Sequence, residues 1–272
     1  MLSDITFGQY VTGRSLLHRL DPRMKLVLTL LFIVVVFLPQ NWAGLGAVAA
    51  FTLLCVTLSR LPLRLMWRSV RPVLLLVLFT SLLNMFYITG GSPLLDLGPI
   101  HITSRGVGTA VFIAVRIVCL LMGSSLLTYT TTPTALTDAI ERLLSPLRVI
   151  HVNAHELAMM MTIALRFIPT LMEETDKIMA AQKARGADME SGGLIRRVRA
   201  MIPILIPLFV SSFRRAYDLA LAMECRCYRG GEGRTRMRSP HIAPRDIAAL
   251  AAVAVFAGGL IALNVLFGSV LA

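Results

Sequence analysis

The sequence predicts an all-α integral membrane protein with about five transmembrane helices and a cytoplasmic helical domain. Hydrophobic residues make up 56% of the 272 residues, only 15% are charged, and the mean hydropathy is +0.73. Soluble domains rarely have such a composition. The apolar residues are also gathered into blocks long enough to cross a bilayer, and most of the basic residues lie between these blocks.

Five apolar blocks are candidate membrane spans: Met24–Leu38, Trp42–Ser59, Pro72–Ile88, Gly106–Leu127 and Ile247–Val270. The first block is short, because a hydrocarbon core of about 30 Å needs about 20 helical residues. We therefore expect its helix to extend back to Leu20 or on to Gln40. Trp42 lies where an interfacial aromatic residue belongs.

The basic residues predict the orientation of the chain in the cell membrane. The net charge is +12, yet all but two of the 27 Lys and Arg residues fall on one side of a five-span chain. The exceptions are Arg105, at the start of the fourth span, and Arg116, inside it. By the positive-inside rule, we expect the N-terminus in the cytoplasm and the C-terminus outside. Topology thus explains the basic charge, and nucleic-acid binding is not expected.

The stretch from Thr130 to Arg245 is too long to be a simple connection between two spans. We predict a transmembrane region of four spans over residues 1–130, a cytoplasmic or interfacial helical domain over 131–246, and a C-terminal transmembrane helix over 247–272. The first helix of the middle domain starts at Thr132-Pro133-Thr134 and ends near Ser145-Pro146.

Further helices follow in the middle domain. With Asn153 as its cap, one helix covers Ala154–Phe167, a break or kink follows at Pro169, and a polar helix over Thr170–Ala184 ends at Arg185-Gly186. The apolar run Met201–Val210, interrupted by Pro203 and Pro207, is predicted to lie at the membrane–water boundary or under a partner. A last helix around Arg214–Glu224 runs to Cys225-Arg226-Cys227 and stops at Gly230-Gly231. The many methionines fit either adaptable packing or a surface for several partners.

Two short patches, Ala184-Arg185-Gly186 and Cys225-Arg226-Cys227, resemble each other and each follows a predicted helix. An Arg at a helix end places a fixed cation where it can enter an acidic groove of a partner. For either patch alone, a C-capping surface cation is the simpler interpretation. Because the patch occurs twice, in a chain without a nucleotide site, we favour docking to two copies of a partner.

Motifs for enzymatic chemistry are incomplete. The chain has no G-x-x-x-x-G-K-[ST], so we do not expect it to hydrolyse ATP by itself. The run His155–Met159 lacks the second His of a zinc protease, Ser124 and Ser125 have no evident base, and the pair Cys225/Cys227 has only His241 nearby as a further metal ligand. We predict no catalytic, cofactor-binding or metal site.

Arg116 is the one strong charge predicted inside a span. The simpler interpretation is a structural cation that faces the bundle interior and bonds Asn84, Ser124 or backbone carbonyls. A role in a transport pathway is the alternative.

A series of motifs runs through nearly the whole chain: Phe7-Gly8-Gln9-Tyr10, Ser15, His18-Arg19-Leu20-Asp21-Pro22-Arg23-Met24-Lys25-Leu26, Arg116, Thr131-Thr132-Pro133, Leu165-Arg166-Phe167-Ile168-Pro169, Ala184-Arg185-Gly186-Ala187-Asp188 and Met223-Glu224-Cys225-Arg226-Cys227-Tyr228. In combination they resemble the transmembrane coupling (T) component, EcfT, of energy-coupling factor vitamin transporters. The similarity is greater to the shared type, which serves several substrate-binding subunits, than to the dedicated types.

The resemblance implies a non-catalytic membrane scaffold in an ABC transporter complex. Such a scaffold joins two ABC-type ATPases, which bind ATP, to a small substrate-binding membrane subunit called the S component. Arg185 and Arg226 would each dock one ATPase at the end of a coupling helix. Cys225 and Cys227 replace the small flanking residues usual at the second patch, but Cys is itself small. The vitamin or similar micronutrient would bind in another chain.

A stand-alone secondary carrier of a small solute is the main alternative. It would need broken helices at mid-membrane in two repeated halves. Five spans with one long cytoplasmic insertion do not show that pattern. An intramembrane protease is a third, weaker alternative, since Ser124 and Ser125 lack a base.

Overall fold

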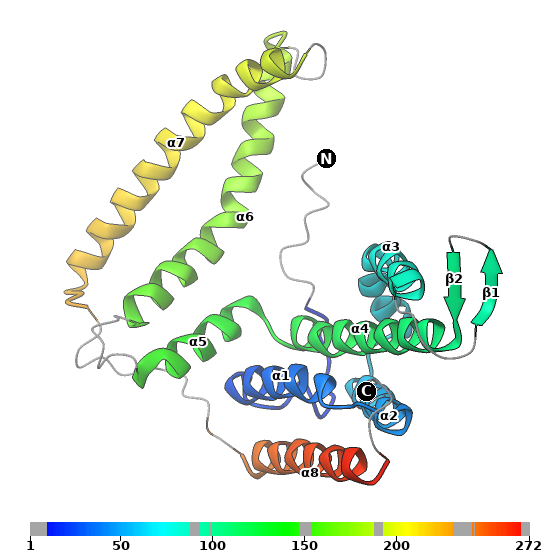
Figure 1. Ribbon diagram of the computed structural model, residues 1–272. Coiled ribbons are helices and arrows are strands. Elements are labelled where there is room, and N and C mark those ends of the chain that lie inside the picture. Colours follow the sequence, from blue (N-terminus) through cyan, green and yellow to red (C-terminus); the bar gives the residue numbers. More distant parts are fainter. Residues whose placement is uncertain are drawn as a thin grey trace. The chain divides into compact units, whose positions relative to one another are not determined.

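A computed structural model describes residues 10–87, 93–97, 100–146, 154–187, 193–230, 241 and 243–267 (Figure 1). In these residues the helices are α1 (Pro22–Phe37), α2 (Trp42–Ser59), α3 (Leu63–Tyr87), α4 (Ser104–Thr130), α5 (Pro133–Leu144), α6 (Ala154–Ala184), α7 (Leu194–Cys225) and α8 (Pro244–Phe267). The predicted all-α membrane class is confirmed. One antiparallel hairpin, β1 (Pro93–Leu97) with β2 (Ile100–Thr103), lies between α3 and α4.

The chain divides into two compact units. The span unit, residues 8–139 and 240–272, holds α1 to α4, most of α5 and α8. The paired-helix unit, residues 140–239 together with 1–7, holds the end of α5 and the long helices α6 and α7. That residues 131–246 act as one functional domain stays a prediction.

Four of the described helices are long and apolar enough to cross a membrane: Trp42–Ser59, Leu63–Phe86, Ser104–Thr130 and Pro244–Leu266. Helix α1 has only 16 residues and rises about 24 Å, so the expected extension to Leu20 or Gln40 is wrong. Its start is fixed because the Asp21 side chain accepts the N–H of Arg23 (2.9 Å). Its end precedes Pro39, which has no N–H to continue the helix.

Helix α8 lies parallel to α1, although the two are far apart in the sequence (Figure 1). At their starts, Asp246 Oδ1 accepts the N–H of Asp21 (2.9 Å). At their other ends, Asn264 donates to the carbonyl of Leu38 (2.7 Å) and accepts the N–H of Gln40 (3.1 Å). The starts of α1 and α8 lie together, and so do their other ends. Helix α1 with its short flanks therefore spans the same membrane depth as the apolar helix α8.

Helix α3 begins at Leu63, not at Pro72 as expected, and continues through Pro72. The carbonyl of Pro62 accepts the N–H of Leu65 (2.9 Å) and starts the helix. The basic residues Arg64, Arg68 and Arg71 therefore lie on the first turns of α3, where they are exposed, and not in a connection.

The core of the span unit lies between α1, α2, α4 and α8. Its buried side chains are Phe32, Val35, Val36, Val48, Cys119, Val253 and Leu260. Phe51 stacks on Phe256 at 4.3 Å between ring centroids. A Cβ on Gly123 would lie 2.1 Å from the ring of Phe32, so only glycine allows this approach of α4 to α1.

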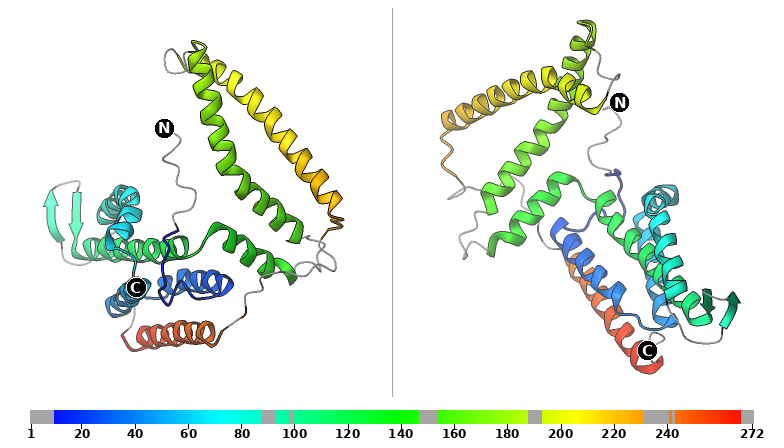
Figure 2. Two further views of the ribbon diagram at one scale, coloured as in Figure 1. Left: turned by 180° about the vertical axis from the view of Figure 1, so that it is seen from behind. Right: turned by 45° about the horizontal axis from the view of Figure 1, so that its top comes forward.

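Helices α6 and α7 form an antiparallel pair, joined where α6 ends and α7 begins (Figures 1 and 2). Arg215 donates to Glu174 (2.7 Å), and Gln182 donates to the carbonyl of Pro203 (3.5 Å). Of the break or kink expected at Pro169, the break is wrong, as are the interruptions at Pro203 and Pro207, because both helices continue through these residues. Each proline removes one helix hydrogen bond, which a long, laterally packed helix can bear. Asn153, the expected cap, lies outside the described residues.

Candidate functional site

Helix α6 ends in a Schellman motif around Arg185. The N–H of Gly186 donates to the carbonyl of Lys183 (3.0 Å), and that of Ala187 donates to the carbonyl of Gln182 (3.0 Å). Gly186 has φ +82, the left-handed conformation that this motif needs and that glycine adopts without strain. The predicted helix stop at Arg185-Gly186 is thus confirmed, with Arg185 as the C-cap.

Helix α7 ends in the same motif around Arg226. The N–H of Cys227 donates to the carbonyl of Glu224 (2.8 Å), and that of Tyr228 donates to the carbonyl of Met223 (3.0 Å). Here the left-handed residue is Cys227, with φ +57. The sequence placed the stop at Gly230-Gly231, but the helix ends at Cys225. Cysteine rarely adopts this conformation, so the sequence pointed to the nearest glycine instead.

Both arginines lie exposed at these helix ends, as do their neighbours in each patch. Within the described part of the chain, neither guanidinium has a hydrogen bond or an ion pair. From Pro203, which bonds Gln182 near the end of α6, helix α7 rises about 33 Å to Cys225. Two identical cations therefore stand at opposite ends of one helix pair, too far apart to share one binding partner's pocket.

Helix α7 also exposes a row of large apolar side chains at helical spacing: Ile195, Val198, Ile202, Ile206, Phe209 and Phe213. Phe213 is 71% exposed and stacks on Phe209 at 6.3 Å between centroids. This helix is not among the candidate spans found in the described residues. A row of this kind marks a contact surface for a membrane or a protein partner.

Arg116 of α4 lies beside the connection between α1 and α2. It donates to the carbonyl of Pro39, and its guanidinium lies over the ring of Phe112 (4.8 Å to the centroid). Of the three kinds of partner expected, the carbonyl is the one found, since Asn84 donates to Thr80 and Ser124 to Leu121. These contacts suit a structural cation, and that role stays a prediction.

The opening motif of the chain forms a network at the start of α1. Ser15 and His18 are bonded (2.6 Å), Asp21 caps the helix, and the Lys25 ammonium donates to the carbonyls of His18 (3.2 Å) and Thr130 (2.8 Å). Asp246, which joins α8 to this network, was not predicted from the sequence. The sequence signal that could have indicated Asp246 is its place as an acidic residue in the first turn of the last helix.

Of the residues considered for catalysis or metal binding, His155, Ser124 and Ser125 make other hydrogen bonds. His155 bonds Glu141 (2.9 Å), and the hydroxyls of Ser124 and Ser125 donate to the carbonyl of Leu121. Cys225 and Cys227 are free thiols. No group of His, Cys, Asp or Glu able to hold a metal occurs among the residues that the structure describes.

Comparison with known proteins agrees with the sequence motifs. Residues 13–237 match the family model CbiQ, described as cobalt transport protein. The chain is 50% identical over 260 residues to the energy-coupling factor transporter transmembrane protein EcfT of Thermosediminibacter oceani, with 96% of this chain and 98% of the relative covered. It is 52% identical to EcfT of Clostridium kluyveri (93% and 94% covered) and 45% identical to EcfT of Bacillus subtilis (94% and 97% covered). The chain therefore belongs to the EcfT family of transmembrane components of energy-coupling factor transporters.

Proposed function

We propose that this transmembrane component couples ATP hydrolysis by two ABC-type ATPases to the reorientation of a substrate-binding S component. The observation that carries the proposal is the pair of exposed arginines, without a partner among the described residues, at the C-terminal ends of α6 and α7. The geometry supports one ATPase at each end. The vitamin or similar micronutrient that is taken up would bind to the S component. The chain itself supplies no ATP site.

The docking chemistry follows from the side chain. Arg is always charged and presents a rigid fork of five donors that matches a carboxylate. Each arginine is the C-cap of a long helix that a Schellman motif closes, so a force on the arginine would act along the helix axis. Small neighbours, Ala184 and Gly186 at one end and Cys225 and Cys227 at the other, let the tip enter a groove.

The S component would contact apolar surface. The row of apolar side chains on α7 is one candidate surface, and α3 is another, since Leu75 and Leu78 are 77% and 66% exposed. A movement of the paired helices could then reach a membrane-embedded partner through α7. Both helix ends and this row lie in the paired-helix unit.

Charge reversal at the two arginines tests the proposal. Removing one partner of a desolvated charge pair costs roughly 2–5 kcal/mol, and repulsion adds to this. We expect Arg185→Glu or Arg226→Glu to lower uptake strongly and to loosen one ATPase, and the double variant to release both ATPases and abolish uptake. Co-purification and vitamin uptake by cells or proteoliposomes are the measurements.

Arg214→Glu is the matched control. Arg214 is exposed on α7 like Arg226, but it lies in the middle of the helix and not at its end. We expect a clearly smaller loss of uptake. The proposal fails if the double variant still retains both ATPases and transports normally. It also fails if Arg214→Glu is as damaging, because general basic charge would then explain the result.

We further propose a cytoplasmic N-terminus and an external C-terminus. The distribution of Lys and Arg and the parallel course of α1 and α8 support this orientation. Thr89, Gly90 and Gly192 lie outside the described residues. In a variant without Cys225 and Cys227, a cysteine at Thr89 or Gly90 should react with an impermeant reagent on intact cells. A cysteine at Gly192 should react only after lysis. If it were labelled on intact cells, the proposed orientation would be wrong.

A further inference from the structure

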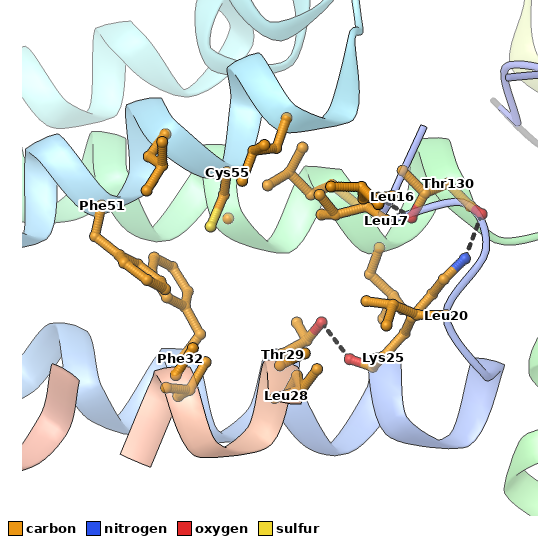
Figure 3. A pocket seen from close by; sticks show the side chains of 18 of the residues that line it. Leu16, Leu17, Leu20, Lys25, Leu28, Thr29, Phe32, Phe51, Cys55 and Thr130 are labelled. Carbon is orange, nitrogen blue, oxygen red and sulfur yellow. Dashed lines mark hydrogen bonds between the residues drawn. The ribbon is translucent and has the colours of Figure 1, made fainter. Parts of the chain in front are cut away.

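The span unit contains a cavity of about 420 Å³ between α1, α2, α4 and α8 (Figure 3). Its volume is within the range of about 300–1,000 Å³ that is usual for small-molecule sites. The segment Leu16–Leu20 closes part of it. One face of α8 lines it at helical spacing, with Arg245, Ala249, Ala252 and Val253 all on the cavity side.

The two ends of the cavity differ in chemistry. Lys25, Thr130 and Arg245 line the end where α1 and α8 begin. The opposite end is formed by Phe32 and Phe51, and the walls between are almost wholly apolar (Figure 3). From Lys25 to Phe32 helix α1 rises about 10 Å. The cavity is thus an apolar slot with two cations at one end.

The ammonium of Lys25 is buried and forms no salt bridge in the described residues. Lys25 is only 7% exposed, and its ammonium donates to two neutral carbonyls, of His18 and Thr130. In the described residues it makes no ion pair with a carboxylate. Asp21 and Asp246 lie near enough to attract this charge, but their oxygens accept backbone N–H groups and neither residue lines the cavity. An ammonium has three donors, and in the described residues two of them donate to these carbonyls, so the third can donate to an acceptor inside the cavity.

We propose that this cavity binds an anionic phospholipid. One acyl chain would lie along the apolar walls toward Phe32 and Phe51, and the phosphate would lie at the end with Lys25 and Arg245. The argument is charge complementarity combined with the setting. The cavity lies among membrane-spanning helices, and an amphiphile with one anionic end matches its single polar end. A soluble anion would leave the apolar walls uncovered. This inference does not depend on the proposed coupling to ATPases.

The occupant would join four helices. The slot is lined by α1, α2, α4 and α8, and an acyl chain would fill it. The acyl chain would then contribute packing that the protein does not supply at this position. We expect bound anionic lipid to raise the thermal stability of the full chain.

Native mass spectrometry of the full-length protein, purified in mild detergent, tests the site. The probes are phosphatidylglycerol and phosphatidylcholine with identical acyl chains. We expect phosphatidylglycerol to bind more tightly and to raise the melting temperature. Each Lys or Arg near an anionic lipid surface contributes about 1 kcal/mol, so Arg245→Gln should weaken phosphatidylglycerol binding about fivefold. Because Arg245 is exposed, we expect its replacement to leave the fold intact.

Arg68→Gln, an exposed arginine on α3 that does not line the cavity, is the control and should keep wild-type affinity. Ala249→Phe should fill the slot and weaken the binding of both lipids, whereas Ala254→Phe, on the exposed opposite side of α8, should not.

A phosphatidylglycerol with a diazirine in its acyl chain should crosslink to α1, α2 or α8. Equal binding of the two lipids, no effect of Arg245→Gln, or crosslinks only outside the cavity would overturn the proposal.

Discussion

Helices α6 and α7 end with the same hydrogen bonds but with different residues. At both ends an arginine is the C-cap, and the next two N–H groups donate to the carbonyls three and five residues before them. The left-handed residue is Gly186 in one case and Cys227 in the other, with φ +82 and +57. Glycine adopts this conformation without strain, whereas for cysteine it costs about 1–2 kcal/mol.

The comparison shows which features the helix end requires. Glycine is not one of them, since two hydrogen bonds of about 0.5–1.5 kcal/mol each can offset the strain at Cys227. The shared features are the arginine cap, the left-handed residue and small neighbours. The ends differ in two respects: the α7 end carries two exposed thiols beside its guanidinium, and its backbone is strained. The two ends should therefore respond differently to thiol reagents and to changes at the left-handed residue.

Modification of the exposed thiols should give the largest difference between the two ends. A bulky maleimide on Cys225 or Cys227 would prevent Arg226 from entering a groove, while the α6 end has no thiol and should stay intact. We expect loss of one of two ATPases and at least a tenfold fall in uptake, because the contact of a buried charge is lost. ATPase stoichiometry after labelling is the measurement.

The double variant Cys225→Ala/Cys227→Ala is the control for this reagent. It should resist the maleimide, because Cys119 is buried and Cys55 is partly buried. If the labelled wild-type complex retains both ATPases, the α7 end is not a docking site. If it loses both, the two ends are not independent.

Gly186→Val should disrupt the α6 end. A β-branched residue at φ +82 is strongly disfavoured, so we expect a local loss of about 2 kcal/mol. There is open space around Gly186, so the cost comes from the backbone and not from a clash. Hydrogen exchange at Gly186 and Ala187 should become faster, and uptake should fall. Ala187→Val is the control; an equal acceleration there would contradict the role of φ.

Much of the fold could be predicted where local signals are strong. Helix α5 has the predicted limits, because Pro133 suits a first turn and Ser145-Pro146 ends a helix. Helix α2 also has the predicted limits, Trp42–Ser59. The errors lie where tertiary packing decides. The sequence predicted the start of a span at Pro72, a break or kink at Pro169 and interruptions at Pro203 and Pro207, yet all four prolines lie inside helices.

The candidate site was predictable in part. An Arg followed by Gly after a polar helix predicted the end of α6. The end of α7 was placed too late, because the cost of a left-handed Cys227 does not show in the sequence. Contacts between distant residues, such as Asp21 with Asp246 and Lys25 with Thr130, have no local signal. The cavity lined by α1 and α8 therefore could not be anticipated.

Gly186→Cys makes the α6 end chemically like the α7 end. We expect a modest cost of about 1 kcal/mol, from the left-handed conformation alone, with uptake largely retained. The variant should acquire the maleimide sensitivity of the α7 end, and in a chain without Cys225 and Cys227 it should lose the ATPase at α6 on labelling. A variant that transports as poorly as Gly186→Val would show that glycine itself is required.

Cys227→Gly is the reverse change and should have the smallest effect. It removes the strain at φ +57 but also increases the backbone entropy of the unfolded chain, and the net gain should be at most about 1 kcal/mol. The N–H groups of Cys227 and Tyr228, which close the motif, should exchange up to about fivefold more slowly in the variant. Uptake should be unchanged, because Arg226 remains at the helix end. Cys225→Ala, inside helical backbone, is the control and should leave exchange at these two positions as it was. Faster exchange in Cys227→Gly would mean that the thiol side chain, and not the backbone conformation, stabilises the end of α7.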